Sequence, residues 1–163
     1  MVQITIRPVG PDELDAVTAV EAACFPPAEA ADRETFRRRI EVFPECFFVA
    51  VCENRVIGFI NGCATDERTI RDEMFTDAKL HKKDGCYQSI FGLAVLPDYQ
   101  RQEVAARLMK HLVADARKRG RRGLILTCKE RLLSYYEKFG YQNLGVSASV
   151  HGGAVWYDML LVL

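Results

Sequence analysis

The sequence carries no excess charge of either sign, because 22 lysines and arginines balance 22 aspartates and glutamates over 163 residues. No overall field therefore draws the chain to nucleic acid or to an anionic membrane surface. No apolar run approaches the roughly 18 residues needed to cross a bilayer. Residues 1–7 also lack the basic and apolar regions of a secretory signal. We expect a cytoplasmic protein with neither nucleic-acid nor membrane partners.

Closely spaced cysteine pairs are also absent, although the chain has six cysteines. None forms a Cys-x-x-Cys motif, which argues against zinc binding and thiol redox chemistry. Most lie within apolar segments, where cysteine behaves as a small core residue. We expect reduced thiols, with no disulfide and no metal, at Cys24, Cys46, Cys52, Cys63, Cys86 and Cys128.

No repeat, low-complexity tract or linker interrupts the chain, so we expect one domain over residues 1–163. Apolar periodicity predicts strands at residues 4–8, 46–53, 56–63, 87–95, 124–128, 141–150 and 154–162. It predicts helices at residues 11–23, 33–40, 101–119 and 132–139, and a mobile loop or short helix at 66–85. This order predicts an α/β fold with a mixed, mostly antiparallel sheet of about seven strands flanked by about four helices.

Residues 90–106 combine a short buried strand, a Pro-Asp turn and a Gln-Arg-Gln segment that opens a long amphipathic helix. In that helix Val104, Leu108, Leu112 and Ala116 repeat every four residues, so this stripe is expected to face the sheet. The first N–H groups of a helix lack partners inside it and form a site for anions. The edge of the preceding strand can also hold the amides of a pantetheine arm. The segment therefore predicts a pyrophosphate site for a coenzyme A thioester.

Three motifs make the chain similar to the GNAT superfamily of N-acetyltransferases, and over residues 47–159 to its serotonin (arylalkylamine) branch. The strand motif Leu-Ala-Val is residues 93–95. The pyrophosphate-loop motif Gln/Arg-x-x-Gly-x-Gly/Ala falls on residues 100–105, with Glu103 in place of the first glycine. The Tyr-x-x-Phe-Gly-Tyr signature is residues 136–141. The resemblance implies a GNAT-type domain whose strands splay apart at the acetyl-CoA site.

The resemblance also implies roles for individual residues. Acetyl-CoA is the implied cosubstrate, and its pantetheine arm would be held by the strand residues Leu93, Ala94 and Val95. Its phosphates would be held by backbone amides of Arg101, Gln102, Glu103, Val104, Ala105 and Ala106. Tyr136 would act as the general acid beside the thioester sulfur. The amine pocket would be lined by Phe25, Pro26, Glu29, Thr127, His151 and Trp156, although Phe25 and Trp156 equally suit core positions.

The residues that relay the amine proton in the serotonin enzyme are missing. That enzyme uses a His-x-His pair, whose positions here are Ser89 and Phe91. Neither side chain is a general base, so the proton must leave by another group. The candidates are an ordered water, the carboxylate of Glu21 or Glu29, and His151.

Glu103 is the second departure from the family pattern. It brings a Cβ and a carboxylate to a position where glycine would let the backbone approach an anionic ligand. One outcome is weaker binding of coenzyme A. The other is that the side chain points to solvent, toward Arg101 or Arg107, and binding survives.

These features predict a transferase that moves acetyl from acetyl-CoA directly to the primary amine of a small aryl- or alkylamine. Acetylation of protein N-termini or lysines is one alternative, and it would favour an open, acidic groove. The other is a coenzyme A-binding regulatory protein that has lost catalysis, which a plugged amine tunnel would indicate. We expect a monomer or a homodimer.

Overall fold

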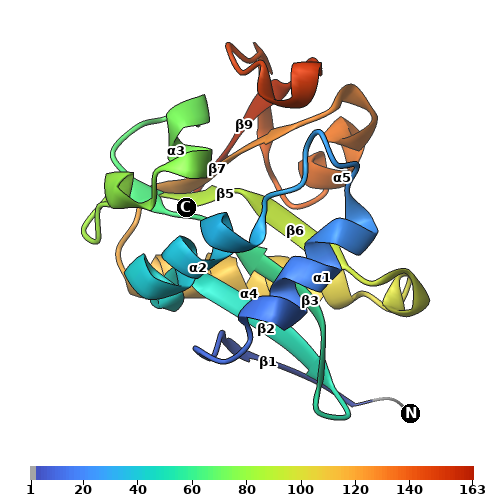
Figure 1. Ribbon diagram of the computed structural model, residues 1–163. Coiled ribbons are helices and arrows are strands. Elements are labelled where there is room, and N and C mark those ends of the chain that lie inside the picture. The colour runs from blue at the N-terminus through green and yellow to red at the C-terminus, as the bar shows by residue number, and fades with distance from the viewer. Residues whose placement is uncertain (1–2) are drawn as a thin grey trace.

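The structure is a computed structural model that describes residues 3–163. Met1 and Val2 lie outside the described residues. They belong to residues 1–7, which were expected not to form a secretory signal. Within these residues nine strands form two sheets, and helices cover both faces of the first sheet (Figure 1). The predicted α/β class is confirmed, as is its mixed and mostly antiparallel pairing, because only β5 and β7 of the described strands pair in parallel.

Each of the two sheets has its own order of neighbouring strands. The first sheet runs β1 (Ile4–Pro8), β2 (Phe47–Cys52), β3 (Arg55–Asn61), β6 (Gly92–Val95). The second runs β4 (Ala64–Thr65), β5 (Tyr87–Ile90), β7 (Gly123–Cys128), β9 (Tyr157–Val162), β8 (Gln142–Val146). The α-helices are α1 (Leu14–Cys24), α2 (Arg33–Val42), α3 (Asp72–Thr76), α4 (Val104–Lys118) and α5 (Leu133–Glu137).

The two sheets arise because the strand predicted at residues 87–95 is broken at Phe91. Its first half pairs with β7, and its second half pairs with β3. Gly62 allows the crossing between the sheets, because a Cβ at this position would lie 1.9 Å from the Ser89 carbonyl oxygen. The described chain thus has nine strands and five α-helices, where the sequence predicted about seven and about four. The two additional strands come from this break, which makes two strands of one, and from the two-residue β4. The additional helix is the short α3.

Helix packing fixes the first sheet from both sides. The predicted stripe of α4 is confirmed, since Val104, Leu108, Leu112 and Ala116 are all buried in one cluster with residues of β2, β3 and β6. The opposite face of the sheet is covered by α1 and α2, whose apolar side chains pack on the alternate residues of the same strands (Figure 1). Because side chains of a strand alternate between faces, β6 lies between the two helical layers and is held rigidly.

Several predicted boundaries were wrong, and backbone geometry explains one of them. The helix predicted from residue 101 begins at Val104, because Arg101 and Glu103 both adopt left-handed φ values of 66° and 63°. The strands predicted at 141–150 and 154–162 are shorter in the structure, where β8 spans Gln142–Val146, β9 spans Tyr157–Val162 and a 3₁₀ turn at His151–Gly153 lies between them. The helix predicted at 11–23 begins only at Leu14, after a turn.

All six cysteines are free. Four are buried, and burial raises the pKa of the Cys46 thiol to about 12 and that of Cys128 to about 11. Within residues 3–163, every helix is too short or too polar to traverse a lipid bilayer.

Candidate active site

The edge of β6 offers backbone groups that no strand uses. Leu96 donates its N–H to the Ile57 carbonyl of β3 at 2.8 Å. N–H groups alternate in direction along a strand, so those of Leu93 and Val95 point away from β3. In the described chain β6 pairs with β3 alone, and β7 has already diverged after its pairing with Ile90. This is the splay that the resemblance implied, and it leaves a strand edge free for an extended ligand.

The N-terminus of α4 lies directly beyond this edge. The first intrahelical bond formed there is from the Arg107 N–H to the Glu103 carbonyl at 3.0 Å, so the N–H groups of Val104, Ala105 and Ala106 have no partner inside the helix. The Gln100 amide donates to the Val95 carbonyl at 3.0 Å and ties the loop to the strand. The free edge of β6 and the N-terminus of α4 therefore both present unpaired backbone N–H groups.

Glu103 is the N-cap residue of α4 and has an unfavourable conformation. Its left-handed backbone is the geometry that the usual glycine adopts freely, and for other residues it costs about 1–2 kcal/mol. Its side chain is exposed and makes no capping hydrogen bond. Arg107, one of its two expected partners, instead donates to the Ile4 carbonyl at 2.9 Å. The Glu103 carboxylate is therefore exposed and has no partner among the described residues.

Tyr136, on α5, lines the same cavity as Leu93. The helix ends at a turn that contains Gly140, whose φ of 99° suits glycine. Within residues 3–163 the Tyr136 hydroxyl has no hydrogen-bond partner, whereas that of Tyr141 donates to Met109 Sδ at 3.3 Å. Burial raises the pKa of Tyr136 above its ordinary value, so the hydroxyl stays protonated at neutral pH. Such a group can donate a proton but cannot readily accept one.

A cavity of about 300 Å³ connects β6 and Tyr136 to the side chains predicted to bind the amine. Five of the six predicted residues line it: Phe25, Glu29, Thr127, His151 and Trp156. Pro26 does not, because its ring is exposed while its carbonyl accepts the N–H groups of Glu29 and Ala30 in a turn. The cavity is open, so the plugged tunnel expected of a regulatory protein is not observed.

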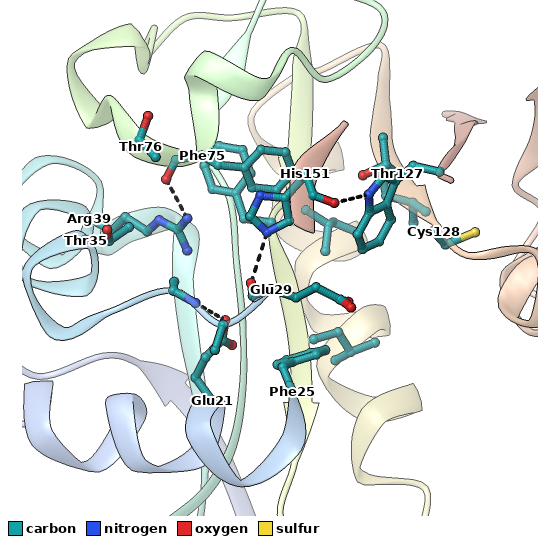
Figure 2. A pocket seen from close by; sticks show the side chains of 18 of the residues that line it. Glu21, Phe25, Glu29, Thr35, Arg39, Phe75, Thr76, Thr127, Cys128 and His151 are labelled. Carbon is teal, nitrogen blue, oxygen red and sulfur yellow. Dashed lines mark hydrogen bonds between the residues drawn. The ribbon is translucent and has the colours of Figure 1, made fainter. Parts of the chain in front are cut away.

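His151 is held in place by three neighbours (Figure 2). Its Nε2 lies 3.0 Å from the Glu29 carbonyl, and its ring stacks on Phe75 at 5.2 Å. Its own carbonyl accepts the indole N–H of Trp156 at 2.8 Å. The Glu29 carboxylate pairs with Lys129 at 2.7 Å. This network makes one wall of the cavity both aromatic and rigid.

Two buried charged side chains also line the cavity. Glu21, on α1, is 7% exposed, and Arg39, on α2, is 4% exposed. Arg39 donates to Asn61 Oδ1 at 3.1 Å and to the Phe75 carbonyl at 2.8 Å, and it lies over the Phe91 ring at 4.7 Å. Burial lowers its pKa to about 10, so the guanidinium is still charged at neutral pH. Burial raises the pKa of Glu21.

The positions of the missing histidine pair are occupied by groups with other tasks. Ser89 is buried and donates its hydroxyl to the Cys63 carbonyl at 2.8 Å. Phe91 lines the cavity with an apolar ring. Neither side chain can relay a proton, as the sequence predicted.

Sequence reasoning missed Arg39, Asn61 and Phe75 as parts of this site. Arg39 stands three residues after the buried Phe36 and so shares its face of α2, which is a signal that the helical period contained. The run of three arginines at residues 37–39 hid it, because such a run is typical of a solvated surface. Phe75 lies on α3, in the segment predicted as a mobile loop or short helix, where no apolar period places side chains.

One further group has the composition of a metal site: Glu45, Cys46 and His81. His81 Nδ1 accepts the Ala64 N–H at 3.0 Å, and its Nε2 lies 3.2 Å from Glu45 Oε1. Nδ1 is therefore occupied, whereas Nε2 lies close to Glu45 without forming a hydrogen bond, and the Cys46 thiol is held protonated by burial. The group ties β4 to the end of α2 rather than facing the cavity.

A model of the acetyltransferase (GNAT) family matches residues 14–141. The chain belongs to the GNAT family of acetyltransferases. The match runs from α1 through β6, the α4 N-terminus and α5, so it includes both the free strand edge and Tyr136. It confirms the resemblance drawn from the three motifs.

Individual relatives of this GNAT domain differ in their chemistry. Serotonin N-acetyltransferase of Mesocricetus auratus is 26% identical over 130 residues, which is 77% of this chain and 60% of that protein. A GNAT-like decarboxylase, GphF, solved with isobutyryl-CoA, has a TM-score of 0.84 at 20% identity, covering 97% of this chain and 98% of that one. The ribosomal-protein-S18-alanine N-acetyltransferase of Escherichia coli has a TM-score of 0.72 at 21% identity, covering 98% and 94%. At these identities the two structures establish the fold alone.

Proposed function

We propose that this protein transfers acetyl from acetyl-CoA to the primary amine of a small aryl- or alkylamine by direct attack. The observation that carries the proposal is the open cavity of about 300 Å³ that joins the free edge of β6 and Tyr136 to an aromatic wall. Its size falls at the lower end of the about 300–1,000 Å³ typical of small-molecule sites. The serotonin enzyme, as a relative, supports an amine of this class.

The residues present fit coenzyme A. The free N–H groups of Leu93 and Val95 match the amides of a pantetheine arm, and those of residues 104–106 match its phosphates. The arm would then end beside Tyr136. When bound, acetyl-CoA supplies an activated acetyl group. The β6 amides would polarise its carbonyl, and Tyr136 would protonate the departing sulfur.

The charges on the cavity wall favour a cationic substrate. Three carboxylates line it, from Glu21, Glu29 and Asp32. Two positive charges face them, the guanidinium of Arg39 and the ammonium of Lys129, which pairs with Glu29 at 2.7 Å, so one carboxylate is in excess. A protonated amine is attracted by this excess, whereas a substrate that carries its own carboxylate is repelled. The rings of Phe25, Phe75, Phe91 and Trp156 provide apolar contacts for an aryl or alkyl body.

Decarboxylation of a carboxylated acyl-CoA is the second candidate. Arg39 places a buried guanidinium in the cavity, which could hold a carboxylate, and the GphF neighbour is a decarboxylase. Acetylation of protein N-termini or lysines is the third candidate, which the Escherichia coli neighbour supports. The small, aromatic cavity favours a small amine over a peptide chain. Six free thiols suit a reducing compartment, and we place the reaction in the cytoplasm.

An amine panel tests the proposal. Release of free thiol from acetyl-CoA is followed with phenethylamine, hexylamine, phenylalanine and a short peptide, and products are identified by mass spectrometry. We expect acetylated phenethylamine and hexylamine, and little product from phenylalanine, which differs from phenethylamine by one carboxylate. Preferential acetylation of the peptide would contradict the proposal in favour of a protein substrate. Release of carbon dioxide from malonyl-CoA without any amine would favour the decarboxylase.

A further inference from the structure

Three buried polar side chains beside the cavity are incompletely paired. Glu21 accepts the Ala31 N–H through Oε2 at 2.8 Å, but its Oε1 has no partner in the described chain. The same holds for Nδ2 of Asn61 and for Nε of Arg39, although these two side chains bond to each other. Buried polar atoms in folded proteins nearly all have partners. One unpaired acceptor and two unpaired donors in the same region therefore indicate a place for a polar ligand group.

The unpaired oxygen of Glu21 lies against the strand that faces the acyl group. Gly92 leaves a space that a single Cβ would fill, and that Cβ would lie 3.7 Å from Glu21 Oε1 and 3.8 Å from Asn61 Nδ2. Gly92 is the residue before Leu93, whose N–H points toward the site of the thioester. A nucleophile bound at Glu21 would therefore be next to the carbonyl that it has to attack.

The other two carboxylates of the cavity have no buried oxygen without a partner in the described chain. Glu29 Oε2 pairs with Lys129 at 2.7 Å, and Asp32 Oδ1 accepts the Thr35 N–H at 2.9 Å as the cap of α2. His151 is fixed between Phe75 and the Glu29 carbonyl, within the aromatic wall. Glu21 is thus the carboxylate with a free oxygen beside β6.

The electrostatic surroundings suit a proton acceptor. Burial raises the pKa of Glu21, while the Ala31 N–H, Arg39 on α2 and His151 on the 3₁₀ turn act in the opposite direction and are outweighed. Cys24, on the same helix, is a protonated thiol because burial raises its pKa. A carboxylate with a raised pKa takes up a proton more readily than an ordinary glutamate and is still ionised once the pH exceeds that pKa.

We propose that Glu21 binds the ammonium group of the substrate through Oε1 and takes its proton, with Asn61 and Arg39 holding the carboxylate in position. This assignment rests on the proposed function. It deepens that function by naming the base that replaces the missing histidine pair.

The protons balance over the whole reaction. An ammonium nitrogen loses two protons when it becomes an amide nitrogen. Glu21 takes the first, which frees the lone pair that forms the C–N bond, and returns it to water through the open cavity. As the C–S bond breaks, sulfur keeps the bonding electrons and receives a proton from Tyr136, whose oxygen regains one from the nitrogen. The sum is an amide, a free thiol and one proton in solution.

The test compares Glu21→Gln with the parent. Glutamine keeps an oxygen for the Ala31 N–H but carries no charge, so the fold is expected to survive. With phenethylamine we expect kcat/KM to fall on the order of 100-fold to 10,000-fold. The parent's activity should decline as the pH falls through the raised Glu21 pKa, and the variant should lack this decline. With hydroxylamine, which is largely neutral at the assay pH, the loss should shrink. A folding defect would not depend on the basicity of the amine. Glu41→Gln, an exposed position on α2, serves as the control.

A binding measurement makes the assignment independent of turnover. Phenethylamine is titrated calorimetrically into protein saturated with coenzyme A, and we expect at least about 10-fold weaker binding by Glu21→Gln, the size of one lost charge-assisted hydrogen bond. Equal amine affinity in parent and variant, or identical pH profiles, would overturn the role of Glu21. If the parent acetylates none of the amines, the proposed function fails, and the binding comparison still decides whether Glu21 holds an ammonium group.

Discussion

Replacing Tyr136 by phenylalanine removes the proposed acid while leaving the packing intact. The ring contacts Tyr135 at 5.2 Å and Tyr141 at 6.0 Å between centroids, and phenylalanine preserves both. The hydroxyl has no partner within residues 3–163, so no intramolecular hydrogen bond is lost. We expect the free energy of unfolding to change by less than about 0.5 kcal/mol. For a chain of this length that corresponds to a shift in Tm of about 1–2 °C.

The rate should respond far more strongly than the stability. Loss of a general acid costs on the order of 100-fold to 10,000-fold in kcat. This equals about 2.7–5.4 kcal/mol of activation free energy. The KM for acetyl-CoA should stay near that of the parent, because the hydroxyl contributes only while the sulfur departs.

The assay is steady-state thiol release with the preferred amine of the panel, in parallel with thermal melting. Tyr135→Phe is the matched control, because Tyr135 is the adjacent tyrosine, does not line the cavity and should keep the parent's rate. If Tyr136→Phe turned over the amine as fast as the parent, Tyr136 would be a packing residue only. Thiolate release would then need no acid.

Three further predictions concern the phosphate loop, the base and the core. Glu103→Gly should tighten coenzyme A binding in calorimetry by about 3-fold to 10-fold, since it removes a carboxylate from a helix N-terminus and relieves a left-handed conformation. Glu103→Gln removes the charge alone, and unchanged affinity in both variants would show that the loop tolerates glutamate. His151→Ala should keep the decline of activity at low pH, because Glu21 carries that titration; loss of the decline would identify His151 as the base instead. Leu112→Ala, at a fully buried position of α4, should cost about 2–5 kcal/mol in urea unfolding, and a loss below about 1 kcal/mol would contradict its central place in the core.

The elements that apolar periodicity controls were predictable from the sequence. The buried stripe of α4 and the strand Ile4–Pro8 follow directly from where apolar side chains recur. The break at Phe91 was not predictable in this way, because no turn residue or change of period marks it between residues 87–90 and 92–95. It depends on two sheets meeting, and on the close approach of Gly62 to Ser89, which are contacts between distant parts of the chain.

The candidate site was likewise predictable where local sequence determines it, and not where it depends on contacts between distant residues. Motifs pointed to β6, the α4 N-terminus and Tyr136 because their roles depend on local backbone geometry at fixed spacing. Residues whose roles depend on tertiary contacts, such as Arg39 and Asn61, carried no local motif. The sequence named both Glu21 and Glu29 as candidates for the base. Only the structure distinguishes them, through the ion pair of Glu29 with Lys129 and the unpaired oxygen of Glu21.

The central claim is that the acetyl group leaves coenzyme A for the nitrogen of an amine. The direct test is to incubate the protein with phenethylamine and with acetyl-CoA that is isotopically labelled in the acetyl group. The products are then identified by mass spectrometry. We predict that the label appears in N-acetylphenethylamine in proportion to the thiol released, and that omission of the amine abolishes release. Thiol release at the same rate without amine, with the label in free acetate, would contradict the account.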